Sequence, residues 1–574
     1  MLRLLLCLLT YSLGFESYGQ TYDMVILNGR VMDGSGNPWY YQDLGIKDGR
    51  IEKLGLLKPG DGEEVLDAKG KIVAPGFVDI HSHADGNQGH EYGLRKDHPM
   101  MKAAHNLVMQ GITTVVVNHD GRSPESIEDQ IAQLQSQGHG PNVAVMVGHN
   151  SIRYRAMGED FRRLATKDEI EDMKRQIVAG MDAGAFGLSA GLEYIPGRWS
   201  NTEEVIDLVS TVKPWGGVYI VHERASGSDA MWFLPSRDLQ RSTMLENIEE
   251  VIAVAEATGV TSSATHVKVK GADYWGVATA IVNLIKTARN RGIDVWADQY
   301  PYNTTGSDGY TELIPGWAIE RDRWRSSLTG SSDDNGGPET SFKDALTKVL
   351  EDDEQRTKLF MDVKREIERR GGPENILVFD YPDESYIGKS ILQLSEELDI
   401  SLVEVAIKLQ REGYPDRPGG ARLRGFSLSE LDIEILAKEP WLITATDAGI
   451  SPPDNPPVHA RYYGTYPRKI AHYAKKRGVI SVEHAVRSST SLPAQFMGFK
   501  DRGMIKEGYM ADIVVFDLDD IQDKATFVNP HLYPEGIEQV LISGEYMVKD
   551  GQLTDNLPGR VIKNTESFRY LGGR

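Results

Sequence analysis

The middle of the chain alternates short apolar runs with longer segments in which apolar residues recur at helical spacing. Helices are predicted at Lys167–Ala183, Met244–Thr258 and Trp275–Arg291. The short runs are typical of buried parallel strands. They are Phe77–His83, Thr113–Asn118, Val143–Gly148, Phe186–Ala190, Val218–His222, Thr261–His266, Ile293–Asp298 and Trp441–Thr446. Eight parallel strands with crossovers between them predict an α/β fold, a TIM (β/α)8 barrel.

Both ends of the chain have another pattern, in which short β-like runs alternate with turn signals. Examples are Asp23–Leu27 near the start and Ala511–Phe516 near the end. Because the termini of a domain often lie close together, we expect both ends to build one small β-sandwich-like domain. It would comprise residues 20–72 and 496–574, with the barrel at 73–495.

A long interval separates the last two predicted strands. It forms an insertion at about residues 307–440, which includes the polar, glycine-rich stretch Ser331–Pro338. An insertion on a loop after a barrel strand lies above the active face and could act as a lid. A disordered surface excursion is the alternative for Ser331–Pro338.

Composition and charge narrow the classes of protein. With 574 residues, 40% of them hydrophobic, the chain can bury a large core. Residues 1–19 have a positive start, the apolar segment Leu4–Leu13 and small residues at Ser17-Tyr-Gly19, which predicts a signal peptide and a periplasmic or secreted protein. The single cysteine, Cys7, lies in that leader. The net charge of −21 argues against nucleic-acid and anionic-membrane partners. The oligomeric state stays open.

Two histidines mark the end of the first predicted barrel strand. His81 and His83 occur in the run Gly76–His83, and residues two apart on a strand point to the same face. Two neutral imidazoles side by side form half of a zinc site. Two solvated histidines near a strand end are the alternative for an isolated pair.

Polar side chains follow the other strands in the same way. Active sites of TIM barrels are built at the carboxyl ends of the strands. The residues there are His81, His83, Asp120, His222, His266 and Asp447. Imidazoles and carboxylates without a thiolate favour zinc over manganese, iron or cobalt. We therefore predict a metal centre at one mouth of the barrel.

The chain resembles the N-acyl-D-amino-acid deacylase (D-aminoacylase) family of the amidohydrolase superfamily. The resemblance covers nearly all of the chain after its leader. It is carried by Val73–His83, Gly111–Val117, Gly187–Glu193, Thr265–Lys268, His459–Arg468 and Arg502–Asp512.

Two positions depart from related patterns. Many deacylases of this family have a bridging cysteine where this sequence has Asp120. A carboxylate can also bridge two divalent ions, so Asp120 is the expected ligand and His119 the competing one. The fourth strand offers Ser189 and Glu193 but no lysine, so the carbamylated lysine of the wider superfamily is not expected.

The resemblance implies roles for the six residues. His222 and His266 would hold the metal that activates water, while His81, His83 and Asp120 would complete the centre or hold a second ion. Asp447 would be the general base and acid. This agrees with general chemistry, because a divalent ion lowers the pKa of bound water to ~7 and a carboxylate can accept its proton.

The resemblance also implies a binding site for the α-carboxylate of the substrate. The residues in the corresponding positions are Lys268, Tyr302, Ser307 and Arg461. A guanidinium with neighbouring hydroxyls suits a carboxylate. A structural ion pair is the alternative for Arg461, and a core aromatic for Tyr302.

The function predicted is that of an exported enzyme with one or two Zn²⁺ ions. It would hydrolyse the linear amide C–N bond of N-acyl-D-amino acids, or of dipeptides with a C-terminal D-residue. A cyclic amidase, similar to hydantoinase or dihydroorotase, is the first alternative. A secreted binding protein without catalysis is the second.

Overall fold

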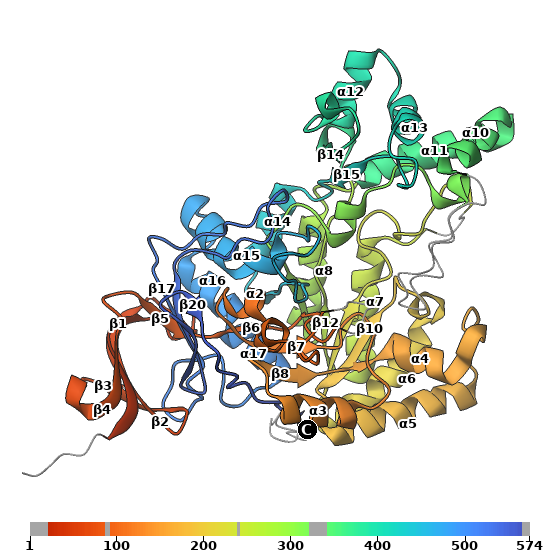
Figure 1. The fold of residues 1–574 in the computed structure, drawn as a ribbon. Coiled ribbons are helices and arrows are strands. Elements are labelled where there is room, and N and C mark those ends of the chain that lie inside the picture. Colours follow the sequence, from red (N-terminus) through yellow and green to blue (C-terminus); the bar gives the residue numbers. More distant parts are fainter. Residues whose placement is uncertain (1–20, 87–91, 238–240, 321–340, 565–574) are drawn as a thin grey trace, which may run out of the picture.

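The computed structural model describes residues 21–86, 92–237, 241–320 and 341–564 (Figure 1). The predicted signal peptide and the stretch Ser331–Pro338 lie outside these ranges. Within them, no helix has both the length and the apolar character needed to cross a bilayer.

Strands from both ends of the chain form one nine-stranded sheet. Its order is β20-β19-β18-β17-β5-β1-β2-β3, with β4 paired to β1. The strands are β1 (Tyr22–Val31), β2 (Tyr40–Lys47), β3 (Arg50–Gly55), β4 (Gly62–Asp67), β5 (Ile72–Pro75), β17 (Ile513–Phe516), β18 (Ile537–Ile542), β19 (Glu545–Lys549) and β20 (Gln552–Leu553). The antiparallel pair β5–β17 joins the two chain ends. The described strands of both chain ends therefore form one hydrogen-bonded sheet, as expected of one β-domain built from both ends; its sandwich-like shape stays a prediction.

The centre of the molecule consists of two parallel sheets. One has the order β6-β7-β8 and the other β16-β13-β12-β11-β10-β9. Their strands are β6 (Phe77–Asp79), β7 (Ile112–Val117), β8 (Asn142–Val145), β9 (Val147–Gly148), β10 (Gly187–Gly191), β11 (Val218–His222), β12 (Thr261–Ala264), β13 (Val295–Gln299) and β16 (Leu442–Thr444). Only Met146 separates β8 from β9, and a parallel bridge between Ser82 and Ala448 links the segments after β6 and β16. All eight predicted strands are thus present, and all but Val218–His222 have shifted ends.

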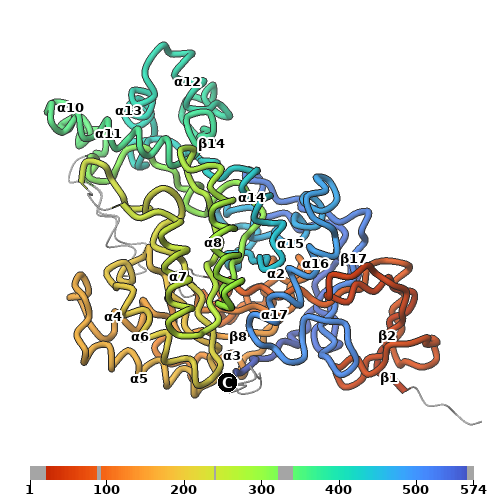
Figure 2. The backbone as a smooth tube through the Cα atoms, turned by 180° about the vertical axis from the view of Figure 1, so that it is seen from behind, coloured from red at the N-terminus to blue at the C-terminus, as the bar shows by residue number. Residues whose placement is uncertain are grey.

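Helices connect the parallel strands and cover them (Figures 1 and 2). They are α1 (Pro99–Ala103), α2 (His105–Val108), α3 (Ile127–Gln137), α4 (His149–Met157), α5 (Lys167–Ala183), α6 (Thr202–Val212), α7 (Met244–Thr258), α8 (Ala278–Asn290), α14 (Glu430–Ala437), α15 (Arg461–Arg468), α16 (Val482–Ser489) and α17 (Ser491–Met497). Capping boxes at Thr166 and Thr243 begin α5 and α7 where the pattern predicted. Helix α8 begins later than predicted because Gly276 has a φ of 93°.

The insertion between β13 and β16 has a hydrophobic core of its own. It contains α10 (Phe342–Glu351), α11 (Asp353–Arg369), β14 (Ile376–Asp380), α12 (Ile391–Leu398), α13 (Leu402–Glu412) and β15 (Arg422–Gly425). Buried residues of this core run from Leu313 to Leu423, whereas α14 contacts α8 of the central part. The insertion projects away from the nine-stranded sheet (Figure 1). Its action as a lid stays a prediction.

Candidate metal centre and active site

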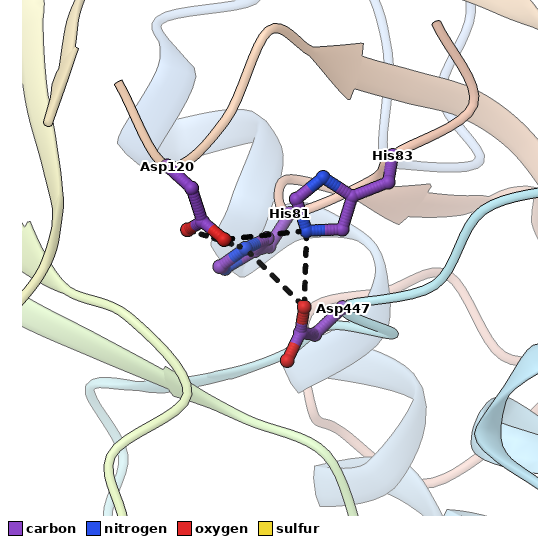
Figure 3. Close-up of side chains that lie close together, drawn as sticks. All are labelled: His81, His83, Asp120 and Asp447. Carbon is purple, nitrogen blue, oxygen red and sulfur yellow. Dashed lines mark hydrogen bonds and ion pairs between the residues drawn. The ribbon is translucent and has the colours of Figure 1, made fainter. Parts of the chain in front are cut away.

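His81 and His83 lie just beyond β6, because that strand ends at Asp79. The prediction that they lie on the strand is wrong, but both rings face the same group of carboxylates (Figure 3). The Nε2 atom of His83 is 3.1 Å from Oδ1 of Asp447 and 3.6 Å from Oδ2 of Asp120. The Nε2 atom of His81 is 3.7 Å from Oδ1 of Asp447 and 3.5 Å from Oδ1 of Asp120.

A second group of possible ligands shares Asp120 with the first. It consists of Asp120, His222 and His266, and in each group the atoms that could bind a cation lie within 4.8 Å of one another. Nδ1 of His222 is 3.7 Å from Oδ1 of Asp120. The rings of His222 and His266 are perpendicular, with centroids 4.5 Å apart. Asp120 is therefore placed where one carboxylate could serve two neighbouring ions.

The buried polar atoms of this centre fit a cation. Both ring nitrogens of His81, Nδ1 of His222 and Oδ1 of Asp120 have no hydrogen-bond partner among the described residues. Buried polar atoms are normally satisfied, so a group of unsatisfied nitrogen and oxygen atoms marks a place for a ligand. Neutral imidazoles with carboxylates are a suitable donor set for zinc.

His119 lies beside this centre without joining either group. Its ring stacks on that of His81, with centroids 4.5 Å apart and planes 25° apart. The two groups of possible ligands in the described chain contain Asp120 and not His119. The geometry thus favours Asp120 over His119 as the ligand from this loop.

Three of the predicted site residues have left-handed backbone conformations. The φ angles are 56° at Asp120, 34° at His266 and 49° at Asp447. For residues other than glycine this conformation is uncommon, and it occurs often at functional sites. It is held here by hydrogen bonds, since the amide of Asp447 donates to the carbonyl of His81 at 2.9 Å. The amide of His266 donates to Oδ1 of Asp298 at 2.7 Å.

Carboxylates around the centre orient its histidines and connect its strands. Glu193 Oε2 lies 2.9 Å from Nε2 of His222, which leaves Nδ1 of that ring facing the site. Asp79 accepts hydrogen bonds from the amides of His81 and Thr446, which links the ends of β6 and β16. Burial raises the pKa of Asp79 to about 7, although these bonds oppose the shift. Sequence reasoning assigned no role to Glu193, Asp298 or Asp79.

Asp447 forms an ion pair with Arg461, the first residue of α15. Nη1 of Arg461 is 2.7 Å from Oδ2 of Asp447. Burial favours the protonated form of Asp447, but the guanidinium and the bond to His83 outweigh it and hold the pKa well below its usual range. The carboxylate is therefore ionised at neutral pH and able to accept a proton.

A cavity of about 260 Å³ opens beside the centre. Lys268, Ser307 and Arg461 line it, as expected for substrate-binding residues, but Tyr302 does not. The aromatic residue of this segment in the lining is Tyr300. The chain turns tightly after β13, where the Tyr302 amide donates to the Tyr300 carbonyl at 3.0 Å. The Tyr302 hydroxyl donates instead to the carbonyl of Ala460 at 3.3 Å, inside the core.

Comparisons with known proteins agree with this site. Residues 64–197 and 397–548 match the amidohydrolase family. The D-aminoacylase of Alcaligenes xylosoxydans xylosoxydans is 28% identical, with 96% of this chain and 99% of that protein covered. The structure is similar to that of the N-acyl-D-glutamate deacylase of Bordetella bronchiseptica in complex with zinc and a phosphonate inhibitor (TM-score 0.68, 26% identity, 95% and 100% covered). It is equally similar to a D-aminoacylase described as having a binuclear metal centre (TM-score 0.68, 25% identity, 94% and 100% covered).

The chain therefore contains an amidohydrolase-family domain, formed by the segments 64–197 and 397–548. Its homology to the D-aminoacylases extends over nearly its whole length, and it is a metal-dependent hydrolase that acts on linear amide bonds.

The choice between Asp120 and His119 can be tested by alanine substitution. Asp120→Ala is expected to lose metal and activity together, because it removes the carboxylate shared by both ligand groups. His119→Ala removes a stacked ring and is expected to be far milder. Asp120→Cys should regain some activity and bind zinc more tightly, since a thiolate is the softer ligand. Metal content and turnover, measured on the same preparations, decide between the two residues. A greater loss of both in His119→Ala than in Asp120→Ala would make His119 the ligand.

Proposed function

We propose that the protein is an exported zinc-dependent deacylase of N-acyl-D-amino acids, or of dipeptides with a C-terminal D-residue. The observation that carries this proposal is the sharing of Asp120 between two groups of ligand atoms, next to a cavity that contains the Asp447–Arg461 pair. The predicted leader at residues 1–19 supports export. The nine parallel strands, of which β8 and β9 act as one, support a (β/α)8 barrel closed by the Ser82–Ala448 bridge.

His222 and His266 would hold the more tightly bound zinc ion together with Asp120. His81 and His83 would complete the centre or hold a second ion. A bound zinc ion lowers the pKa of water to ~7 and polarises a carbonyl oxygen. Glu193 keeps the ring of His222 in the orientation that presents Nδ1.

Asp447 would move the proton. Its Oδ1 faces His81 and His83, while Oδ2 is held by Arg461, so one oxygen is directed at the reacting group. Being ionised, the carboxylate accepts a proton from water at Oδ1 and passes it to the leaving nitrogen. Arg461 and Lys268 line the same cavity and supply positive charge for the α-carboxylate of the substrate.

Hydrolysis of a set of N-acetyl-D- and N-acetyl-L-amino acids and of L-Xaa-D-Xaa dipeptides tests this function. We expect activity on the D-series, its loss after treatment with a chelator, and its recovery with Zn²⁺. Equal activity on the L-series would contradict the stereochemistry. No activity on any linear amide, with turnover of a hydantoin or of dihydroorotate, would replace the proposal by cyclic amide hydrolysis.

Arg461→Lys tests the binding of the α-carboxylate. The variant keeps the charge but loses the planar donor pair of the guanidinium, so kcat/KM should fall. The measurement compares a free-acid substrate with its neutral amide. A carboxylate-binding role predicts that the preference of the parent for the acid collapses in the variant. An unchanged preference would leave Arg461 with the task of holding Asp447.

A further inference from the structure

A second lysine, Lys270, lies in the wall of the active-site cavity and has no part in the chemistry derived so far. Its backbone is fixed from two sides. The amide donates to the carbonyl of Ser226 at 3.1 Å, and bridges connect Lys270 with Gly227 and Leu428. The side chain is buried, with the residue 6% exposed, so the position of the ammonium group is determined by the fold.

The ammonium group of Lys270 keeps donors available for a ligand. It donates to Oγ of Ser307 at 3.0 Å, and its nearest carboxylate oxygen, Oδ1 of Asp308, is 3.9 Å away. That distance exceeds a hydrogen bond. Because an ammonium has three donors, one bond to a neutral hydroxyl leaves room for an incoming anion.

The acidic residues near Lys270 are engaged by other cations. Arg370 is 3.0 Å from Oδ1 of Asp308, and Arg369 and Arg370 both pair with Glu366. Asp308 and Glu366 are thus each paired with a guanidinium. Burial, with Arg370 and Arg369 nearby, lowers the pKa of Lys270 to about 7 against the opposing effect of Asp308. A carboxylate placed beside this ammonium would favour its charged form.

Lys270 is distinct from the cations that serve the reaction centre. Arg461 contacts Asp447 and the ring of Tyr300, and Lys268 lies over the same ring. The contacts of Lys270 are instead Ser307 and Asp308, on the loop after β13. The wall of one cavity therefore carries a further cation besides Lys268 and Arg461, which a substrate with two anionic groups could use.

We propose that Lys270 binds a carboxylate in the side chain of the substrate, so that the enzyme prefers N-acyl-D-amino acids with acidic side chains, aspartate or glutamate. The inference rests on the proposed deacylase function. Ser307 accepts a bond from Lys270 and thereby holds the ammonium at the cavity wall. Lys270 is a determinant of specificity and takes no part in proton transfer.

The test compares two substrates that differ in one charge, N-acetyl-D-glutamate and N-acetyl-D-glutamine. The parent should show the higher kcat/KM for the glutamate. In Lys270→Met this preference should fall by about tenfold or more, the effect expected of one lost charge-assisted hydrogen bond. The glutamine substrate should change by no more than a few-fold. The matched control is Lys348→Met, which removes an exposed lysine of α10 and should leave the ratio unchanged.

Each other outcome decides against the inference. A parent without preference for glutamate overturns it, as does an equal loss on both substrates in Lys270→Met, which would assign Lys270 to the α-carboxylate. If Lys270→Met does not fold, Lys270→Gln replaces it. The ratio of the parent's kcat/KM values for the glutamate and glutamine substrates is then decisive by itself. Failure of the proposed function gives a different result, since the parent would then hydrolyse neither substrate nor any neutral N-acetyl-D-amino acid.

Discussion

Replacement of His222 or His266 by alanine is expected to abolish turnover while leaving the protein folded. Both side chains belong to the ligand group that contains Asp120, and both are buried with their rings 4.5 Å apart. Zinc sites in enzymes use three protein ligands, so the loss of one of them removes most of the affinity. Truncation of a ring at the edge of a cavity leaves the large hydrophobic core intact.

The measurement is zinc content together with kcat/KM on one N-acetyl-D-amino acid, with circular dichroism as the check on folding. The matched control is His472→Ala, which removes a histidine from the π-helix Lys469–Lys476, outside the ligand groups of the described chain. It should keep both metal and activity. Full zinc occupancy in His222→Ala and His266→Ala would refute the assignment.

Several of the strands that carry the site could be predicted because their sequences are largely apolar. Val218–His222, for example, is buried along its whole length and begins and ends where the pattern indicated. Strand ends were harder to predict. The run Phe77–His83 was predicted as one strand, but strand β6 ends at Asp79, where that side chain bonds to the Thr446 segment. Polarity along the chain cannot reveal such a bond between distant strands.

The residues that come together at the candidate metal centre could be predicted from their places after the strands. Residues that follow parallel strands meet at one edge, so His81, Asp120, His222, His266 and Asp447 share a site although they are far apart in sequence. Residues that act through them were missed. The role of Glu193 depends on the distance to His222, and that of Asp298 on a bond to the backbone of His266. Neither contact leaves a periodic signal.

To predict the substrate-binding residues, the backbone conformation of the loop after β13 would have to be known residue by residue. Tyr300 and Tyr302 have the same chemistry and differ by two positions, and a single turn after β13 decides which one lines the cavity. The end of the insertion could not be predicted either, because it depends on contacts between distant helices. Its predicted end at about 440 includes α14, which contacts α8 and belongs to the central part.

Asp447→Asn is expected to lower kcat by about 10²-fold or more, the usual contribution of general acid–base catalysis. The amide keeps the shape of the side chain, and its oxygen can still accept from Arg461. It cannot take up a proton at neutral pH, so the step at Oδ1 is lost. Asp447 also belongs to a ligand group with His81, His83 and Asp120, and metal content must be measured on the same samples.

A matched control exists in Asp523→Asn, because Asp523 also pairs with an arginine, Arg468 at 3.1 Å, and does not line the cavity of the active site. This variant should retain activity, which separates proton transfer from the loss of an Arg–Asp pair. If Asp447→Asn loses metal in proportion to activity, Asp447 is a ligand. If its activity stays within a few-fold of the parent at equal metal content, another group transfers the proton. A large loss at full metal content is the result that the geometry of Oδ1, held between His81 and His83, leads us to expect.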